Sequence, residues 1–267
     1  MLDSIGLAAA VAGGVSLAIG LLLGFAARLF HVHVDEREVM VRELLPGNNC
    51  GGCGFAGCDG LATAIAKGEA KPNACPVGGQ ETAQRIAEVM GVEAGEVVQQ
   101  MAFVHCSGTC DKIKREADYF GILDCRQAAA VPGYAGKSCP TACFGLGTCA
   151  AACPTGAIRV KNGVAVVDRD QCIHCGVCVA SCPQRIIEMR PKYGPVAVAC
   201  SSHKAGKAVK AVCDAGCIAC GLCQKVCPND AIHVIDNLAE VDYEKCIACG
   251  ACVAKCPVKV IHTTTVK

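Results

Sequence analysis

The chain has 267 residues, of which 25 are cysteine and only 10 are aromatic, six Phe and four Tyr with no Trp. This composition excludes a fold built on one large hydrophobic core, and we expect several small domains stabilised by inorganic centres. The formal net charge of +1 gives no basic field for nucleic acid and argues against nucleic-acid binding.

The N-terminal segment is uncharged from Ser4 to Ala27. At ~1.5 Å per residue a helix of this length reaches about 36 Å, which exceeds the ~30 Å hydrocarbon core of a bilayer. The sequence therefore predicts a transmembrane anchor over residues 1–30. A cleavable signal peptide is the alternative, but Asp3 and the lack of an early Lys or Arg argue against it.

The charges flanking this segment predict its orientation. Arg28 and Arg37 follow it and Asp3 precedes it, so the positive-inside bias places the remaining domains on the cytoplasmic side of the inner membrane. Free thiolates require such a reducing compartment, and disulfides would not persist there.

The next segment, residues 31–95, holds cysteines with an uneven spacing. They are Cys50, Cys53, Cys58 and Cys75, and several glycines stand between the first three. Four thiolates around a glycine-rich loop favour a [4Fe–4S] cluster over zinc. Gly52 to Gly57 also spells a dinucleotide fingerprint, but no predicted strand precedes it, so we expect no nucleotide site.

Residues 80–101 show helical spacing of apolar residues, among them Ile86, Val89 and Met90, and predict a packing helix. Residues 96–135 then carry a second group of cysteines, for which we predict a further cluster. Its candidate ligands are Cys106, Cys110, Cys125 and Cys200, with Cys213 as the alternative to Cys200. Buried or spare thiols are the other interpretation of this group.

The second half of the chain holds three C-x₂-C-x₂-C-x₃-C-P runs, the spacing typical of bacterial [4Fe–4S] ferredoxins. In such a run three cysteines bind one cluster and the fourth binds its neighbour. The runs are Cys172, Cys175, Cys178, Cys182; Cys217, Cys220, Cys223, Cys227; and Cys246, Cys249, Cys252, Cys256.

These runs belong to an internal repeat, because residues 153–182 and 227–256 share 16 of 30 positions at an offset of 74. Alternating apolar residues flank Asn162-Gly163 and Asp236-Asn237, which predicts one β-hairpin in each copy. We therefore predict an α+β fold with two ferredoxin-like units, at residues 136–192 (unit 1) and 213–267 (unit 2), joined by a basic linker at 193–212.

Unit 1 lacks one ligand of the pattern, because Leu146 stands where the offset places Cys220. We predict that Cys139 substitutes for it. Crossed ligation then predicts four sets: Cys139, Cys143, Cys149 with Cys182; Cys172, Cys175, Cys178 with Cys153; Cys217, Cys220, Cys223 with Cys256; and Cys246, Cys249, Cys252 with Cys227. With the N-terminal set this makes five [4Fe–4S] clusters, and the second cysteine group makes a sixth.

The order of anchor, Cys50–Cys75 module, Cys106/Cys110/Cys125 segment and tandem ferredoxin repeats resembles the B-subunit family of Rnf complexes. The resemblance covers nearly the whole chain. It implies a subunit of an ion-translocating ferredoxin:NAD⁺ oxidoreductase that accepts electrons from soluble ferredoxin and passes them to membrane subunits. NAD⁺ would be reduced on another subunit, and no residue here would perform acid–base catalysis.

Two other functions fit parts of the pattern. A membrane-anchored polyferredoxin connecting another redox complex, such as a membrane hydrogenase, would carry the same clusters. A corrinoid iron–sulfur protein fits the Cys50–Cys75 module alone. A run of lysines between the two halves of the chain, Lys204, Lys207 and Lys210, is a candidate for attracting an acidic ferredoxin, although such lysines also occur on ordinary solvated faces.

Overall fold

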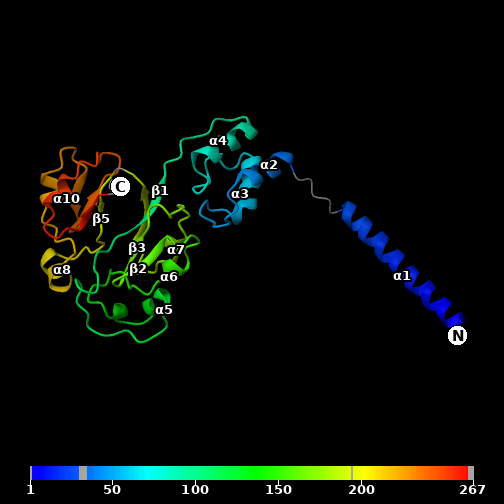
Figure 1. Cartoon of the computed structure of the whole chain (residues 1–267), viewed down its shortest axis with the longest axis horizontal. Coiled ribbons are helices and arrows are strands. Elements are labelled where there is room, and N and C mark those ends of the chain that lie inside the picture. Colours follow the sequence, from blue (N-terminus) through cyan, green and yellow to red (C-terminus); the bar gives the residue numbers. More distant parts are fainter. Residues whose placement is uncertain (1, 30–34, 194, 264–267) are drawn as a thin grey trace.

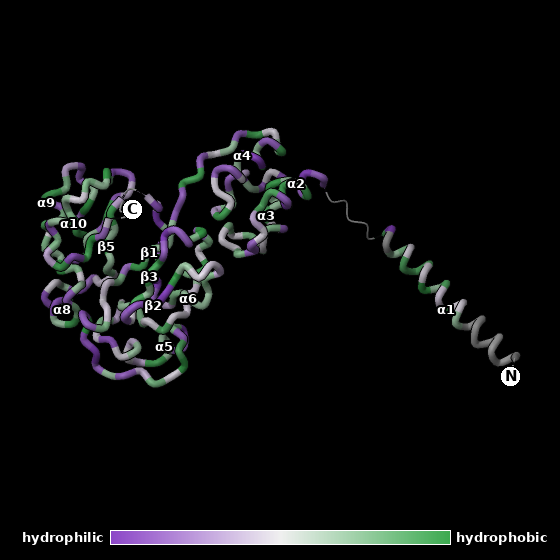
Figure 2. The backbone as a smooth tube through the Cα atoms, in the orientation of Figure 1, coloured by the Kyte–Doolittle hydropathy of each residue, from purple (hydrophilic) through white to green (hydrophobic). Residues whose placement is uncertain are grey.

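The structure is a computed structural model that describes residues 2–29, 35–193 and 195–263. Figure 1 shows helix α1 (Leu2–Leu29) apart from the rest, followed by a helical domain and two small α/β units in a row. Figure 2 shows hydrophobic segments along α1 and along the strands inside the units. The fold is thus mixed α and β, as the sequence predicts.

Helix α1 covers the predicted anchor, and the side chains from Val15 to Phe25 that the structure describes are exposed and mostly apolar. In the described parts of the chain, however, no helix meets the length and hydropathy needed to cross a membrane. The predicted transmembrane span is therefore not supported.

The helical domain consists of α2 (Glu36–Leu44), α3 (Gly57–Ala66) and α4 (Gly79–Met90). Their apolar faces share a core with Val41, Leu61 and Ile86, each at most 1% exposed. Helix α4 ends at Gly91, whose left-handed backbone terminates the helix. The helix predicted over residues 80–101 is therefore too long, and its last residues begin strand β1.

Each ferredoxin-like unit contains the predicted hairpin. In unit 1 β2 (Ile158–Lys161) pairs with β3 (Val164–Val167), and in unit 2 β6 (Ile232–Ile235) pairs with β7 (Leu238–Val241). The two registers are equivalent at the offset of the repeat, since Ile158 faces Val167 and Ile232 faces Val241. Left-handed residues at both turns produce the tight connections expected from the sequence.

Strands from the predicted linkers complete both units. Strand β1 (Gln100–Val104) pairs with β4 (Ile187–Pro191), and β5 (Ala197–Val198) pairs with β8 (Ile261–His262). The remaining short helices follow cysteine loops or connections: α5 (Cys125–Ala129), η1 (Tyr134–Gly136), α6 (Thr148–Ala151), α7 (Val177–Ser181), α8 (Gly206–Val212), α9 (Leu222–Lys225) and α10 (Ala251–Lys255).

A buried arginine joins the two units. Arg190 on β4 is 0% exposed, and its guanidinium lies 5.0 Å from the centre of the Phe103 ring and 5.2 Å from that of Tyr243 in unit 2. Its Nη2 donates to the carbonyls of Pro195 and Val196. These cation–π and hydrogen-bond contacts fix unit 2 against unit 1.

Candidate metal centres

The cysteine loops of both units share a backbone conformation. In each loop, the residue before and the residue after one ligand position have a left-handed backbone conformation. These two residues coil the chain around a concavity. The pairs are His174 and Gly176, Ala219 and Gly221, Ala248 and Gly250, and Gly145 and Gly147. The last pair shows that the first loop of unit 1 keeps this shape although Leu146 replaces the cysteine.

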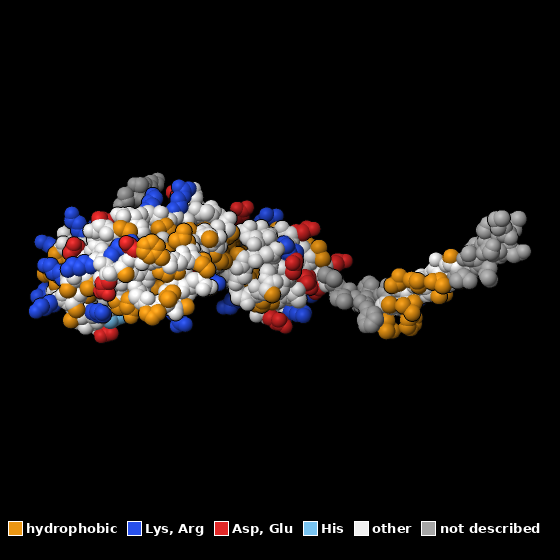
Figure 3. All heavy atoms as spheres, turned by 90° about the horizontal axis from the view of Figure 1, so that it is seen from below, with side chains coloured by type: hydrophobic (Ala, Val, Ile, Leu, Met, Phe, Trp, Pro, Cys, Tyr) orange, Lys and Arg blue, Asp and Glu red, His pale blue; other side chains and the backbone are white. Residues whose placement is uncertain are grey.

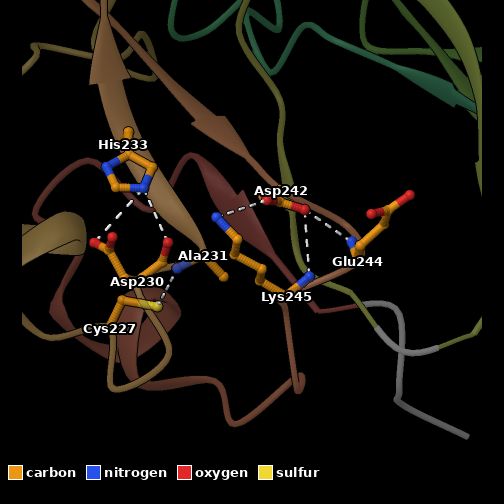
Figure 4. A network of polar contacts seen from close by, with 7 residues as sticks. All are labelled: Cys227, Asp230, Ala231, His233, Asp242, Glu244 and Lys245. Atoms are coloured by element: carbon orange, nitrogen blue, oxygen red, sulfur yellow. Dashed lines mark hydrogen bonds and ion pairs between the residues drawn. The ribbon is translucent and has the colours of Figure 1, made fainter.

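We label the six cysteine sets as sites A to F, in their order from the helical domain to unit 2. Site F, in unit 2, contains the set predicted by crossed ligation. A cavity of about 330 Å³ is lined by Cys227, Cys246, Cys249 and Cys252. Burial, followed by the charges of Cys246 and Cys223, raises the pKa of Cys252 to about 11. The backbone N–H of Ala231 donates to Cys227 Sγ at 3.3 Å (Figure 4). Such hydrogen bonds tune a bound cluster.

Site C, in unit 1, differs from the prediction in one ligand. Its cavity of about 340 Å³ is lined by Cys125, Cys143, Cys149 and Cys182, without Cys139. Burial raises the pKa of Cys149 to about 12, and the charges of Cys143, Cys125 and Cys182 add to this rise.

A hydrogen-bond chain holds Cys125 at site C. Its backbone N–H donates to Thr148 Oγ1 at 2.6 Å, and that hydroxyl donates to Asp124 Oδ2 at 3.1 Å. Asp124 also caps helix α5 by accepting from the N–H groups of Arg126 and Gln127. The loop before unit 1 thus brings a cysteine beside Cys149.

Site D lies between the two units. Its cavity of about 320 Å³ is lined by Cys106, Cys139, Cys200 and Cys213. The sequence predicts Cys106 and Cys200 in one set, with Cys213 as the alternative to Cys200. The structure brings all three together with Cys139. Burial, followed by the charges of Cys106 and Cys139, governs the raised pKa of Cys213.

Two cysteines predicted for this set do not line site D, since Cys125 lies at site C and Cys110 is exposed. The internal repeat indicates that Cys139 belongs at site D rather than at site C. Cys139 and Cys213 are equivalent at the offset of 74, and Cys213 stands outside the C-x₂-C-x₂-C run of unit 2. The same reasoning removes Cys139 from the ferredoxin loop of unit 1.

Three further sets have at least three of their four predicted cysteines near one another. At site A, Cys53, Cys58 and Cys75 share the core of the helical domain. At site B, burial and the charges of Cys175, Cys172 and Cys153 raise the pKa of Cys178 to about 11. At site E, burial and the charges of Cys217 and Cys220 raise the pKa of Cys223, and Cys256 packs against the same core.

Neighbouring sites lie close to one another along one row, A–B–C–D–E–F. Gly52 allows a close approach of A and B, because a Cβ there would lie 2.3 Å from the Cys175 carbonyl oxygen. The Cys143 N–H donates to Cys106 Sγ between C and D, and the Cys217 N–H donates to Cys200 between D and E. Cys149 and Cys178 belong to one core, which brings B next to C, and Cys223 and Cys252 belong to another, which brings E next to F.

The cavities fit iron–sulfur clusters by their donor set. Sites C, D and F are each lined by four cysteines, with no competing carboxylate in their linings. Within the described residues no three His, Cys, Asp or Glu side chains form a group able to hold a single metal ion. Four-thiolate sets are the donors that [4Fe–4S] clusters use.

Comparison with family models agrees with this arrangement. Residues 45–77 match a model described as a putative Fe–S cluster, and residues 136–183, 171–231 and 210–257 match models described as 4Fe–4S dicluster domains.

Curated relatives extend the match over most of the chain. The B subunit of the Na⁺-translocating ferredoxin:NAD⁺ oxidoreductase complex of Acetobacterium woodii is 44% identical over 92% of this chain and 74% of its own length. The chain belongs to the Rnf B-subunit family. The B subunit of the ion-translocating oxidoreductase complex of Methanosarcina acetivorans is 44% identical, over 88% of this chain and 89% of the relative.

A third Rnf B subunit, from the proton-translocating ferredoxin:NAD⁺ oxidoreductase complex of Clostridium ljungdahlii, is 42% identical over 85% of this chain and 81% of its own length. The family resemblance inferred from the order of cysteine modules is thereby confirmed.

Proposed function

We propose that this chain is the electron-transfer subunit of an Rnf complex and relays electrons along sites A to F. The observation that carries this proposal is the row of six cysteine sets, in which each set lies close to the next. Bound [4Fe–4S] clusters would supply one-electron carriers at these sites. The polypeptide positions their ligands and needs no acid–base residue.

The ligand sets that we propose keep four predicted sets and change two. Cys125 replaces Cys139 at site C, and Cys139 joins Cys106, Cys200 and Cys213 at site D. Twenty-four of the 25 cysteines are then ligands, and Cys110 is the remaining thiol. Iron and acid-labile sulfide in the anaerobically purified protein should both approach ~24 per chain. A colourless protein loaded with zinc would refute the proposal.

We further propose that reduced soluble ferredoxin delivers electrons at the unit 2 end. Figure 3 shows Lys and Arg side chains gathered at the end of the molecule opposite α1. Lys207 and Lys210 lie on α8 and Lys204 just before it, and all three are exposed. A Cβ on Gly206 would lie 2.1 Å from the Ile218 carbonyl oxygen, so α8 covers the site E loop.

The docking proposal predicts a charge effect that depends on position. Replacing Lys204, Lys207 and Lys210 with Glu should slow reduction by an acidic ferredoxin about tenfold or more at low salt, and less at high salt. The matched control is Lys67→Glu with Lys71→Glu, exposed lysines of the helical domain. Equal rates in the wild-type chain and the triple variant would exclude this docking surface.

We also propose that the chain attaches to the membrane part of the complex through α1, with the cysteine domains on the cytoplasmic side. Its support is the series of exposed apolar side chains that includes Leu17, Leu21 and Phe25, each 68% exposed. Membranes containing the complex should retain the full chain in carbonate washes, whereas a chain lacking residues 1–30 should be released more readily. Equal retention would assign attachment to other subunits.

A further inference from the structure

Lys137 is a buried cation in the middle of the row of sites. Only 2% of the residue is exposed, whereas most lysines of this chain lie on its surface. Its Nζ donates to the carbonyl oxygen of Cys143 at 2.6 Å and to that of Gly163 at 2.7 Å. The turn from Gly133 to Ser138 therefore directs its lysine inward.

The backbone holds this lysine in place from both sides. Lys137 forms an isolated β-bridge with Arg115, and Ser138 donates its N–H to the Lys114 carbonyl at 3.0 Å. Its Nζ reaches the hairpin turn at Gly163 and the first cysteine of the site C loop. Because the Lys137 side chain is held in place, hydrogen-bonding to two carbonyls costs it little conformational entropy. Both acceptors are neutral, so its positive charge stays uncompensated.

No carboxylate compensates this charge within the described residues, because none of the ion pairs there includes Lys137. The sulfurs of Cys106 and Cys143, which would be anionic as cluster ligands, lie within the electrostatic reach of this lysine. Burial raises the pKa of the Cys106 and Cys143 thiols, and the positive charge of Lys137 partly offsets this rise. Cys106 lines site D and Cys143 lines site C, and the Cys143 N–H donates to Cys106 Sγ at 3.4 Å.

We propose that the buried ammonium group of Lys137 is the shared counter-charge of sites C and D and raises the reduction potentials of both. This inference rests on the proposed function, since it requires clusters at these sites. Four thiolates around a [4Fe–4S] core of charge +2 leave a net charge of about −2, and one-electron reduction adds another negative charge. A fixed positive charge in a poorly solvated site stabilises the reduced form.

Three substitutions separate charge from hydrogen bonding and volume. Lys137→Gln keeps a donor but removes the charge, Lys137→Met keeps the length alone, and Lys137→Arg keeps the charge. The control is Lys161→Met, which removes an exposed lysine from β2 near the same hairpin turn. Iron content and midpoint potentials, followed by electron paramagnetic resonance in the full chain, are the measurements.

In the Gln and Met variants we expect two of six centres to titrate at more negative potentials, while the Arg and Lys161→Met chains match the wild type. The centres that move should be those lost in Cys125→Ser and Cys213→Ser. The shift should persist at high salt, because a buried charge is poorly screened. Iron loss in Gln and Met but not in Arg would also support the counter-charge.

Either of two results would overturn the inference. One is a fully loaded Lys137→Gln chain with unchanged potentials. The other is equal iron loss in all three Lys137 variants, which would assign the lysine a packing role. Failure of the proposed function is distinguishable from both, because the wild-type chain would then lack iron.

Discussion

Units 1 and 2 build the same loop but differ in the source of one cysteine. In unit 2 the second cysteine of the run, Cys220, belongs to the loop itself and is exposed. In unit 1 Leu146 occupies that position, and Cys125 reaches site C from helix α5, outside the repeat. Both loops keep equivalent left-handed residues and equivalent hairpin registers. The cavity of site C is thus lined by four cysteines although one of them comes from outside the repeat.

The change also covers site C with additional structure. Helix α5 and the turn at residues 134–136 form a small core of Ala128, Ala135 and Phe144, against which Leu146 and Cys125 pack. Unit 2 has no equivalent segment within its described residues 213–263, and its Cys220 side chain is exposed. The two units therefore offer a direct test of ligand source against ligand position.

The largest effect is expected from removing the ligands that differ. Cys125→Ser should cost unit 1 one cluster, about four irons, as Cys220→Ser should in unit 2. Electron transfer along the row should fall more than tenfold in both. Iron analysis and stopped-flow reduction measure the two effects, and Cys110→Ser, at the thiol outside the sets, should change neither. Full iron loading of Cys125→Ser would restore Cys139 as the candidate ligand.

Converting unit 1 to the pattern of unit 2 sharpens this comparison. Adding Leu146→Cys to Cys125→Ser places a thiol at the position equivalent to Cys220, in a loop with the same backbone conformation. We expect the double variant to regain most of the lost iron. Leu146→Ala in the same background is the matched control and should regain none. Equal iron in the two double variants would show that the loop alone cannot position this ligand.

A smaller effect is expected at a position where one loop has room for a Cβ atom and the other does not. Gly145 and Ala219 are equivalent and left-handed, at φ 75° and 55°. A Cβ on Gly145 would lie 2.4 Å from the Gly163 carbonyl oxygen. Gly145→Ala should destabilise unit 1 by about 1–3 kcal/mol or more, and thermal loss of visible absorbance measures it.

Two controls separate the clash from the backbone strain. Gly147→Ala has the same left-handed strain, but its nearest contact, Val160 Cγ2, lies at 3.7 Å, so its cost should be about 1 kcal/mol. Ala219→Gly should change the stability of unit 2 by less than that amount. A Gly145→Ala chain as stable as Gly147→Ala would show that the Gly163 turn moves aside.

The smallest effect concerns an aspartate that follows each hairpin. Asp168 Oδ1 accepts from the N–H groups of Asp170 and Gln171, and Asp242 Oδ1 accepts from those of Glu244 and Lys245 (Figure 4). The Lys245 N–H, first among several hydrogen bonds, lowers the pKa of Asp242. Its stabilisation is therefore present above the unfolded pKa of ~3.9 and is lost as the pH falls through the lower folded value.

Asp242→Ala and Asp168→Ala should each lower the cluster-loss temperature slightly at pH 7, and by similar amounts, because the turns are equivalent. Asn at either position keeps an acceptor and should restore most of the difference. A large effect at one aspartate alone would mean that the two turns contribute unequally to their units.

Spacing alone predicted much of the candidate site. Three C-x₂-C-x₂-C-x₃-C-P runs define local loops, and the turn residues Asn162-Gly163 and Asp236-Asn237 define hairpins, because both depend on neighbours within a few residues. Site F contains the set expected from crossed ligation. Helix length was predicted less well, since Gly91 ends α4 before an apolar segment that pairs with β4.

The sequence by itself determined the family, the ferredoxin-like repeats and the cysteine chemistry, since these follow from short-range spacing and the order of modules. Only the tertiary structure decided that Cys125 belongs with site C, that Cys139, Cys106, Cys200 and Cys213 meet between the units, and that Lys137 is buried beside them. Those residues come from segments up to about a hundred positions apart, and only the packing of β1, β5 and α5 against the repeats brings their side chains together.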